Sequence, residues 1–395
     1  MGYKSFLKFG YFLTIAASIA CMLLAVIGGV AQFVSPIAVP NIALLGFVLP
    51  GFVVVNFCLL FYWGIFRRKR WFIFPLIAIL FNIPYLFKTI QFHSNSWNTS
   101  KQEKGRQNKV YTVATYNMAM LFRTRDAGTV SNLAHAFAQE NVDVVCFQEF
   151  FYDGGWWNKE MTDSLFNVWP YHYRTEHYPD FLPLAIYSKY PISNGHHVHF
   201  VNCRNSFIYC DVDLPEGMTR VFCAHLQTTG LRRQYKKIKE AWRVDQEHME
   251  ADTRLDNTWG EYSPLYGVKH NEGDGKSSLQ AFRNARKIFL SNLDERVGQA
   301  EELKKQILQS PYPSIVCGDF NSQPSSYVYR TISKGLQDGF VASGNSLSGS
   351  YRFGGGLFRI DYVLYSKPFE AVAYQIKPWT FSDHYPVFMQ IKRSE

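Results

Sequence analysis

Two long apolar runs near the N-terminus constrain this chain more than any other feature of its sequence. Residues 11–34 and 41–66 carry no charged side chain, and each is longer than the roughly 20 apolar residues with which a helix crosses a bilayer. A third run, 71–87, is shorter and is interrupted by an asparagine and a proline. We expect this run to span the membrane too, with an interfacial segment as the alternative. Residues 1–91 are therefore predicted to form a membrane region of about three transmembrane helices.

The charges that flank these runs predict the orientation of the chain. Lys4 and Lys8 flank the first run, the cluster "RRKR" at 67–70 separates the second from the third, and residues 1–100 contain no Asp or Glu. Positive residues are enriched in cytoplasmic loops. The N-terminus and the 67–70 loop are thus predicted to be cytoplasmic. With three spans, the rest of the chain would be extracytoplasmic, in a multi-pass protein of the cell membrane.

The net charge of +9 does not by itself indicate a nucleic-acid-binding protein. Seven of the 41 Lys and Arg lie in residues 1–100, which leaves 34 against the 32 Asp and Glu of the chain. The soluble part is therefore nearly neutral, whereas the affinity of nucleases rests largely on neutralising many phosphates. The basic excess is explained by membrane topology.

The seven cysteines indicate neither a zinc site nor a redox motif, because the chain has no CxxC spacing. Several of them lie in apolar, strand-like segments, where a free cysteine behaves as a small hydrophobic residue. Cys203 and Cys210 could pair outside the cell, and the sequence leaves that question open.

The remainder of the chain predicts a linker and one layered domain. Residues 92–109 are polar and indicate the linker. In 110–395, short apolar runs that end in polar residues predict β-strands, and apolar positions at helical spacing over 129–140 and 282–309 predict helices. Many strands with few helices favour an α/β sandwich. The stretch 229–281 is polar and rich in charge and glycine, and we expect it to be an insertion near one end of the sheets.

Oxygen-bearing and imidazole side chains stand where the predicted strands end. Asp319 and Asn321 follow the apolar run "PSIVC", and residues two apart in a strand point to the same face. A simple turn is the alternative, since Asp, Asn, Ser and Pro are common in turns. The other residues of this kind are Asn117, Glu149, His225, Gln227, Asp361, Asp383 and His384. Each has an ordinary structural explanation by itself, but their recurrence at strand ends predicts an active site with hard oxygen ligands and histidine.

Seven ordered motifs carry a resemblance to a known family: "TYNM", "FQEF", "AIYSKYPI", "AHLQT", "GDFNSQP", "RIDYV" and "SDHYPV". In this order they resemble the endonuclease/exonuclease/phosphatase superfamily, whose fold is DNase-like, over residues 110–392. The resemblance implies a four-layer α/β sandwich with two central, mostly antiparallel β-sheets. It also implies hydrolysis of phosphate esters with Mg²⁺ or Mn²⁺.

The same resemblance implies a metal site. Phosphoester hydrolysis needs charge neutralisation on the phosphoryl oxygens, an activated water in line, and help for the leaving oxygen. Glu149 would be the main metal carboxylate, and Asn117 would lie beside it on the metal or the phosphate. Asp383 resembles the second acid on the metal side.

The catalytic roles implied by the resemblance fall on five residues. Asp319 would orient or deprotonate the attacking water, and Asn321 would donate to the phosphate. His384 would lie against the phosphate, kept cationic by Asp361. His225 resembles a second histidine that assists the leaving group. Weaker candidates for substrate contacts are Asn205 and Gln227.

The substrate is the property that the sequence constrains least. A lipid headgroup is our first choice, because a membrane anchor would hold the domain at the bilayer surface. In addition, "FFYDGGWW" (150–157) places aromatic side chains, which favour the membrane interface, after Glu149; a packed loop is the alternative. A metal-dependent nuclease is the less favoured function, and a catalytically silent binding protein is the alternative from another class. No protein partner is inferred.

Overall fold

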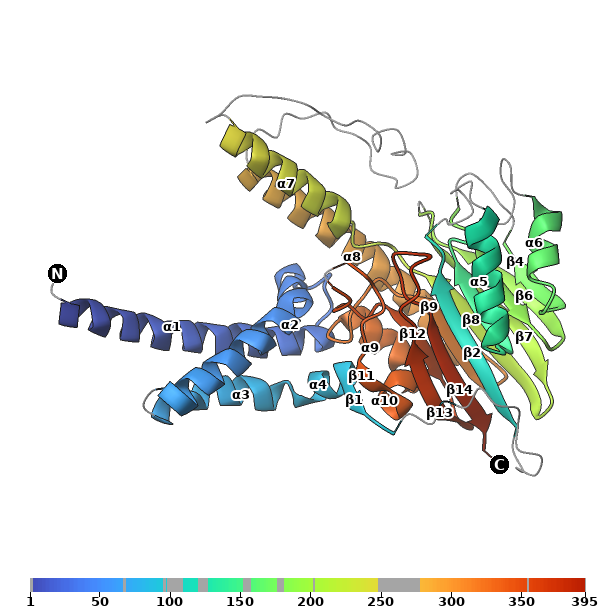
Figure 1. The fold of residues 1–395 in the computed structure, drawn as a ribbon, viewed down its shortest axis with the longest axis horizontal. Coiled ribbons are helices and arrows are strands. Elements are labelled where there is room, and N and C mark those ends of the chain that lie inside the picture. Colours follow the sequence, from blue (N-terminus) through green and yellow to red (C-terminus); the bar gives the residue numbers. More distant parts are fainter. Residues whose placement is uncertain are drawn as a thin grey trace.

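The computed structural model describes most of the chain, with several gaps. The described residues are 3–66, 69–94, 97, 109–119, 127–151, 158–175, 181–201, 203–247, 278–353 and 355–394. Two six-stranded β-sheets form the centre of the soluble part (Figure 1). All seven cysteines are free, so Cys203 and Cys210 do not form a disulfide.

The first sheet holds the N-terminal strands of the domain and its C-terminal strand. Its order is β13 (Phe369–Ile376), β14 (Val387–Arg393), β2 (Val110–Asn117), β3 (Val144–Gln148), β5 (Leu184–Ser188) and β4 (Tyr171–Arg174). Only the pair β2 and β3 is parallel here. The β3 strand is buried along its whole length, which explains its unbroken apolar run.

The second sheet is built in the same way. Its order is β10 (Gln337–Asp338), β12 (Asp361–Tyr365), β9 (Ser314–Asp319), β8 (Gly217–His225), β7 (Ser206–Leu214) and β6 (Ile192–His199). Only β8 and β9 are parallel. In each sheet the single parallel pair therefore brings two strand C-termini to the same edge.

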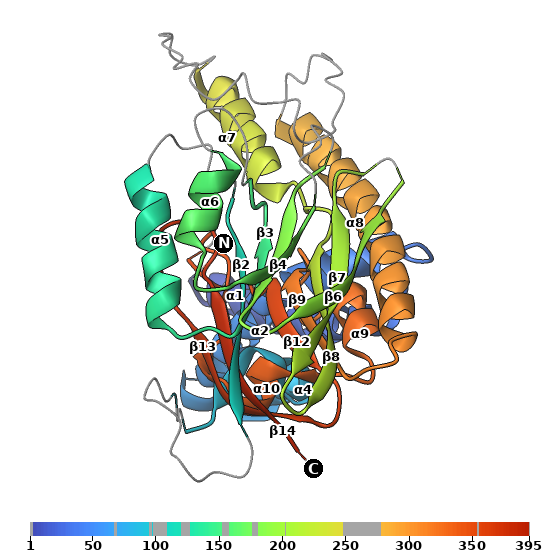
Figure 2. The same ribbon diagram turned by 90° about the vertical axis from the view of Figure 1, so that its right-hand side faces the viewer.

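Helices cover the outer faces of both sheets. Figure 2 shows α5 (Ala127–Gln139) and α6 (Lys159–Leu165) on one side, with α8 (Ser278–Leu308) and α9 (Tyr327–Ser333) on the other. One apolar core lies between the sheets and includes Val113 and Ile208. A further apolar core lies between each sheet and the helices on its outer face. The predicted four-layer α/β sandwich with mostly antiparallel sheets is thus confirmed.

The predicted insertion at 229–281 contains one described helix, α7 (Leu231–Glu247), which packs beside α8. Residues 248–277 of this prediction lie outside the described residues. Two short elements, α10 (Gly339–Ser343) and β11 (Asn345–Leu347), follow β10.

The membrane region contains two helices that are long and apolar enough to cross a bilayer. These stretches are Leu7–Phe33, within and just after α1 (Tyr3–Val30), and Pro40–Ile65, which begins with α2 (Pro40–Phe61). The third predicted run forms α3 (Ile73–Phe81) and α4 (Ile83–Thr89), which are bent by 55° and count as a span only if taken together.

The bend between α3 and α4 follows from the two residues that interrupt the apolar run. Pro84 stands in the first turn of α4, where its missing N–H is tolerated. Asn82 lies at the break and is buried, and its side-chain amide donates to the carbonyl of Ala25 in α1 at 3.1 Å. The break is therefore anchored on the neighbouring helix.

The chain leaves the membrane region through a strand that joins the soluble domain. β1 (Ile90–Phe92) pairs antiparallel with β11. Most of the predicted linker 92–109 lies outside the described residues, but Trp97 packs against the core between the first sheet and its helices. The membrane region and the domain thus share secondary structure.

Candidate active site

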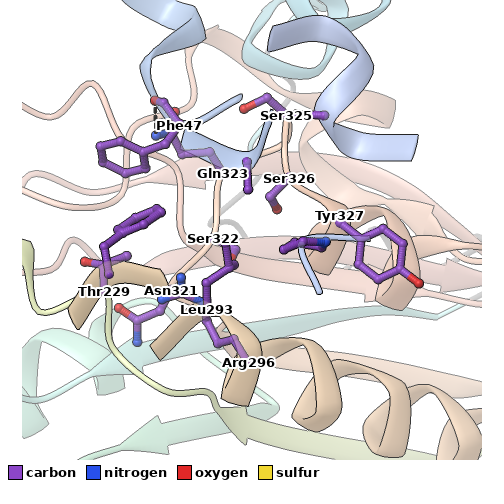
Figure 3. Close-up of a pocket in the computed structure, with 14 residues that line it drawn as sticks. Phe47, Thr229, Leu293, Arg296, Asn321, Ser322, Gln323, Ser325, Ser326 and Tyr327 are labelled. Atoms are coloured by element: carbon purple, nitrogen blue, oxygen red, sulfur yellow. Dashed lines mark hydrogen bonds between the residues drawn. The ribbon is translucent and has the colours of Figure 1, made fainter. Parts of the chain in front are cut away.

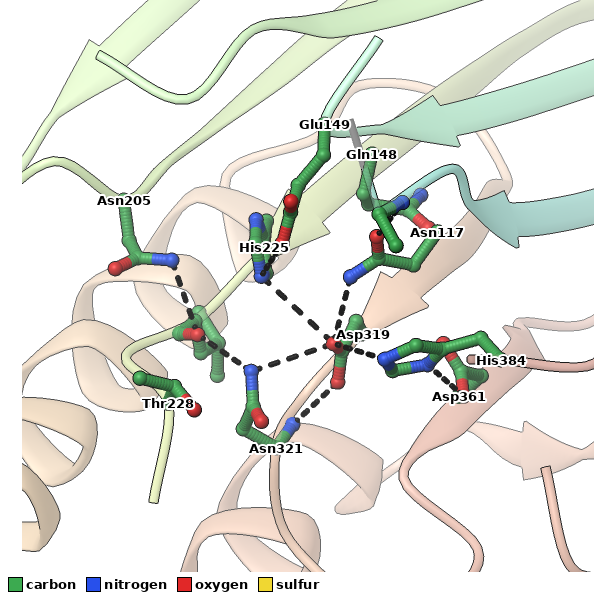
Figure 4. A network of polar contacts seen from close by, with 12 residues as sticks. Asn117, Gln148, Glu149, Asn205, His225, Thr228, Asp319, Asn321, Asp361 and His384 are labelled. Carbon is green, nitrogen blue, oxygen red and sulfur yellow. Dashed lines mark hydrogen bonds and ion pairs between the residues drawn. The ribbon is translucent and has the colours of Figure 1, made fainter. Parts of the chain in front are cut away.

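The strand ends bring the predicted residues together in one buried cluster. Asn117 and Gln148 are paired at the ends of the parallel strands β2 and β3. His225 and Asp319 are paired in the same way at the ends of β8 and β9. Asp361, the first residue of the antiparallel strand β12, is the partner of Asp319 on the other side. Figure 4 shows the resulting convergence on Asp319.

Asp319 is the centre of this network. Its Oδ2 accepts hydrogen bonds from the side-chain amides of Asn117 at 3.1 Å and Asn321 at 3.3 Å. Its Oδ1 accepts one from the backbone N–H of Asn321 at 2.8 Å. Asn321 adopts a φ of +48°, a left-handed conformation that asparagine tolerates, and this turn folds its amide back onto Asp319.

The environment of Asp319 makes it a proton acceptor near neutral pH. Burial raises the pKa of this carboxyl to about 7, and the negative charge of Asp361 acts in the same direction. His384, Asn321 and Asn117 offset part of the rise, because a nearby cation and hydrogen-bond donors favour the charged form. A base with such a pKa is suited to removing a proton from water.

His384 forms an ion pair with Asp361. Its Nδ1 lies 3.0 Å from Oδ2 of Asp361, and its Nε2 lies 3.8 Å from Oδ2 of Asp319. Burial by itself would lower the pKa of His384, but the charges of Asp361 and Asp319 outweigh it and raise the pKa to about 10. The imidazole is therefore a cation whose Nε2 faces the centre of the cluster.

His225 has the opposite charge state. Burial, with the cationic His384 nearby, lowers its pKa to about 3. Its Nε2 lies 3.8 Å from Glu149 and 3.7 Å from Asp319, and its buried Nδ1 has no hydrogen-bond partner within the described part of the chain. The cluster thus holds one cationic and one neutral imidazole.

The two weaker candidates, Asn205 and Gln227, lie in or beside the loop behind the cluster. The side-chain amide of Asn205 donates to the carbonyl of Leu226 at 3.1 Å, and Asn321 donates to the same carbonyl at 2.9 Å. Gln227 turns its side chain toward Cys203. Its backbone N–H and C=O are held by the side chains of the α8 residues Gln299 and Arg296.

Asp383 is not part of the buried network. Its carboxylate forms an ion pair with Arg232, in the first turn of α7, and its side chain is 30% exposed. The backbone carbonyl of Asp383 accepts from the N–H of Arg352. The sequence places Asp383 next to His384, but the chain directs the two side chains to different partners.

The aromatic stretch after Glu149 is packed where the structure describes it. Phe150 and Phe151 are buried, and the Phe150 ring stacks on Phe147 within the core of the first sheet. Membrane contact by these two side chains is therefore excluded, and the packed-loop alternative holds for them. Residues 152–157 lie outside the described residues.

Sequence reasoning missed two serines that hold the cluster together. Ser382 donates to the carbonyl of Asn117 at 2.8 Å and accepts from the N–H of His384 at 3.1 Å. Its position at the start of the motif "SDHYPV" could have indicated it. The hydroxyl of Ser350 accepts from the N–H groups of Ile360 and Asp361. Ser350 lies in a polar stretch of sequence outside the motifs, so no sequence pattern could have indicated its role.

The chemistry of the cluster fits a hard divalent cation. Asp319, Asp361 and His384 place possible ligand atoms within 4.8 Å of one another, and they form the one such group found among the described residues. Because His384 is held as a cation, only the two carboxylates of this group could bind a metal in that state. The side chain of Glu149 is also directed into this region (Figure 4). Several buried carboxylates crowded together repel one another, and bound Mg²⁺ or Mn²⁺ would offset that repulsion with the oxygen ligands these ions prefer.

Comparison with known proteins agrees with this geometry. The model of the Endonuclease/Exonuclease/phosphatase family matches residues 114–384, more than half of the chain. The chain belongs to this family. Members of the family hydrolyse phosphate esters and typically use divalent metals, so the predicted family and the predicted reaction class are confirmed at that level. A second model, a domain of unknown function (DUF8431), matches residues 9–89 of the membrane region.

The chain is also similar to solved structures. A family protein from Beutenbergia cavernae is 16% identical, with 72% of each chain covered and a TM-score of 0.49. A family protein from Bacteroides thetaiotaomicron is 15% identical over 73% of this chain and 100% of its own, with a TM-score of 0.47. Truncated TDP2 from Caenorhabditis elegans is 15% identical over 71% and 97%, with a TM-score of 0.46. No curated protein matches the chain.

Proposed function

We propose that this family member is a membrane-anchored hydrolase that uses Mg²⁺ or Mn²⁺ to cleave phosphoesters of lipid headgroups at the outer surface of the membrane. Family membership and the buried cluster around Asp319 support the reaction class. The choice of a lipid rests on one observation, which is that the loop after Asp319 is seated on a membrane helix.

Two hydrogen bonds join this loop to α2. The side-chain amide of Gln323 donates to the carbonyl of Phe47 at 3.1 Å, and the hydroxyl of Ser325 donates to the carbonyl of Gly46 at 2.9 Å. The Phe47 ring stacks on Phe358 with centroids 5.7 Å apart. The segment that carries the catalytic carboxylate and its asparagine therefore continues directly into a contact with the membrane region.

The length of the second apolar stretch bears on the depth of this contact relative to the bilayer. Pro40–Ile65 comprises 26 residues, or about 39 Å of helix, whereas the hydrocarbon core is roughly 30 Å thick. If the whole excess of about 9 Å lies at the N-terminal end of α2, it corresponds to nearly two helical turns, which end near Gly46. The loop after Asp319 would thus lie at the level of the lipid headgroups.

A small pocket also lies at this junction. It is lined from the membrane side by Ala31, Pro36, Ala43 and Phe47, and from the domain by residues that include Asn321 (Figure 3). The pocket has room for only one or two water molecules, so it marks where the two regions meet and does not identify the substrate.

The contacts of the domain also support three membrane spans. The first turns of α2 contact the 323–325 loop, and β1, directly after α4, pairs with β11. The beginning of α2 and the end of α4 would then lie on the same side of the membrane, which requires α3 and α4 to cross together as one bent span. With Lys4 and Lys8 in the cytoplasm, that side is extracytoplasmic.

In the proposed mechanism Asp319 receives the proton of the attacking water, and Asn321 donates to a phosphoryl oxygen. The cationic His384, held by Asp361, stabilises the charge that develops on the phosphoryl group. The neutral His225 donates a hydrogen bond to the leaving oxygen.

The metal would be held chiefly by Glu149 and Asn117, and when bound it supplies neutralising charge to the phosphoryl oxygens. Asp383 would act as a second acid on the metal side only if its ion pair with Arg232 opens.

The test is a comparison of substrates with the full chain reconstituted in vesicles. Phospholipids, including sphingolipids, are assayed beside plasmid DNA, RNA and a soluble nitrophenyl phosphodiester, each with and without EDTA. We expect metal-dependent release of a lipid headgroup and loss of this activity in Asp319→Asn. Rapid cleavage of DNA with every lipid intact would make the protein a nuclease, and no hydrolysis of any substrate would favour a silent binding protein.

A further inference from the structure

The helix α7 and the first half of α8 form a pair that projects from the domain. They lie side by side in both views and extend toward the side on which α1 and α2 lie (Figures 1 and 2). Gln234 on α7 and Ala285 on α8 are buried, and Phe289 on α8 packs in the core between the second sheet and its helices, with its ring against Phe47 of α2. None of the proposed catalytic residues lies on it.

The exposed surface of this pair is strongly basic. Within residues 231–240 and 280–293, the exposed cationic side chains are Arg232, Lys236, Lys237, Lys239, Arg283, Arg286 and Lys287. We call these seven residues the basic patch. Glu240 is the one exposed acidic residue in these two segments, whose side chains are described except that of Leu231; the exposed acids Asp294 and Glu295 follow directly on α8. The chain after residue 100 is nearly neutral, with 34 Lys and Arg against 32 Asp and Glu, so the patch is a local concentration of charge.

Internal ion pairs do not account for this charge. Arg232 pairs with Asp383, and Arg286 donates to the side chain of Asn41. Lys237, Lys239, Arg283 and Lys287 form no ion pair with any residue in the described part of the chain. Four neighbouring cations without counter-charges repel one another and therefore fit an external anionic partner.

The patch lies next to the membrane helices. The contact between Arg286 and Asn41 joins α8 to the first turn of α2, where that helix begins its apolar stretch. One helical turn on either side of Arg286 keeps Arg283 and Lys287 within about 10 Å of this point, which is the distance over which surface charges act at physiological salt. Two exposed aromatic residues, Tyr235 and Phe282, lie among the basic ones, as is typical of helices at a bilayer surface.

We propose that the basic patch binds anionic lipid headgroups of the bilayer in which the protein is anchored. Clusters of four to eight Lys and Arg on an amphipathic helix typically bind acidic lipids, and the anchor supplies the high local concentration that such contacts need. Binding there orients the domain on the membrane surface. This proposal is independent of the reaction that the Asp319 cluster performs.

The test uses the full chain in nanodiscs and reads hydrogen–deuterium exchange, which requires no enzyme activity. Discs of phosphatidylcholine alone are compared with discs that contain phosphatidylglycerol. We expect anionic discs to slow exchange in residues 231–240 and 280–293 by about tenfold, because several cations act together. This protection should disappear in high salt.

The variant Lys237→Gln/Lys239→Gln/Arg283→Gln/Lys287→Gln should lose the protection. The variant Lys159→Gln/Lys367→Gln, which removes exposed lysines elsewhere on the domain, should keep it. Exchange in β7 and β8 reports whether each variant is folded. Equal exchange in the two kinds of disc would overturn the proposal. Protection by duplex DNA, with none by phosphatidylglycerol, would also overturn it and make the patch a nucleic-acid surface.

Discussion

The hydroxyl of Ser325 donates a hydrogen bond of 2.9 Å to the carbonyl of Gly46, across the junction of the catalytic domain and helix α2. Pro50 stands four residues after Gly46 within the same helix. Because proline has no N–H, it cannot pair with that carbonyl as the helix would require. Gly46 also permits close packing, since a Cβ there would lie 2.6 Å from the Cβ of Ala31. The domain thus satisfies a polar group that α2 leaves unpaired.

The first prediction concerns this junction. Ser325→Ala leaves the Gly46 carbonyl buried without its partner, and we expect a loss of about 1–3 kcal/mol in the free energy of unfolding. Thermal unfolding of the full chain in detergent measures the effect. Ser333→Ala is the matched control, because the Ser333 hydroxyl contacts only an exposed carbonyl in its own helix. Equal stabilities of the two variants would show that the junction contributes nothing.

The second prediction separates activity from stability at Asp319. Asp319→Asn keeps the shape of the side chain but removes the base, so hydrolysis of a soluble phosphodiester should fall by about two to four orders of magnitude. Any change in the melting temperature at pH 8 should be small beside the loss of activity. Removing the buried charge, which burial and Asp361 make costly there, offsets the hydrogen bonds that a side-chain NH2 cannot accept. Asp213→Asn, at an exposed position, should change neither property. Full activity in Asp319→Asn would refute the assigned role.

The third prediction concerns the pH dependence of the His384–Asp361 pair in metal-free protein. The pKa of His384 is raised to about 10 in the folded state, above the value of about 6.5 in an unfolded chain. This group therefore stabilises the fold fully below about pH 6.5, and its contribution is lost as the pH rises through 10.

Asp361→Asn should lower the pKa of His384 from about 10, because the larger counter-charge and its hydrogen bond are lost while burial persists, and Asp319 still favours the cation. Nuclear magnetic resonance of labelled histidines measures this change. His197, whose pKa is lowered to about 4 by burial and by His199, serves as the internal control and should not move. An unchanged pKa of His384 in the variant would show that Asp361 does not form the ion pair.

The fourth prediction concerns the metal. Chelation with EDTA should abolish hydrolysis, and Mg²⁺ or Mn²⁺ should restore it. Glu149→Gln should weaken metal binding by about tenfold or more, measured by calorimetry, because the carboxylate supplies the charge that a hard cation requires. Glu160→Gln, at an exposed position, should bind the metal normally. Failure of the unaltered protein to bind either ion at millimolar concentration would favour the silent binding protein.

The fifth prediction concerns topology. We expect a phosphatase reporter that works only outside the cytoplasm to be active when it is fused after residue 395. Three spans and a cytoplasmic N-terminus place the domain outside. The same reporter fused in the 67–70 loop should be inactive. An inactive C-terminal fusion would show that α3 and α4 do not cross the membrane.

The sequence by itself determined the elements and most members of the cluster. Charge-free runs cannot be explained except by a bilayer or a core, and short apolar runs such as "PSIVC", each followed by polar residues, predict strands. Polar residues directly after such strands lie at the same sheet edge wherever the strands run parallel. The positions of Asn117, His225 and Asp319 could therefore be predicted without knowing how the two sheets pack.

The partners of individual side chains were decided only by the tertiary structure. Asp383 and His384 are adjacent in sequence, yet one pairs with Arg232 and the other with Asp361. The contact between Ser325 and Gly46 joins residues 279 positions apart. Such contacts depend on the relative placement of whole layers, which results from many small packing contributions that no local pattern encodes. Local periodicity specifies which face of a strand is buried, and only the packed sheets and helices determine which polar groups meet there.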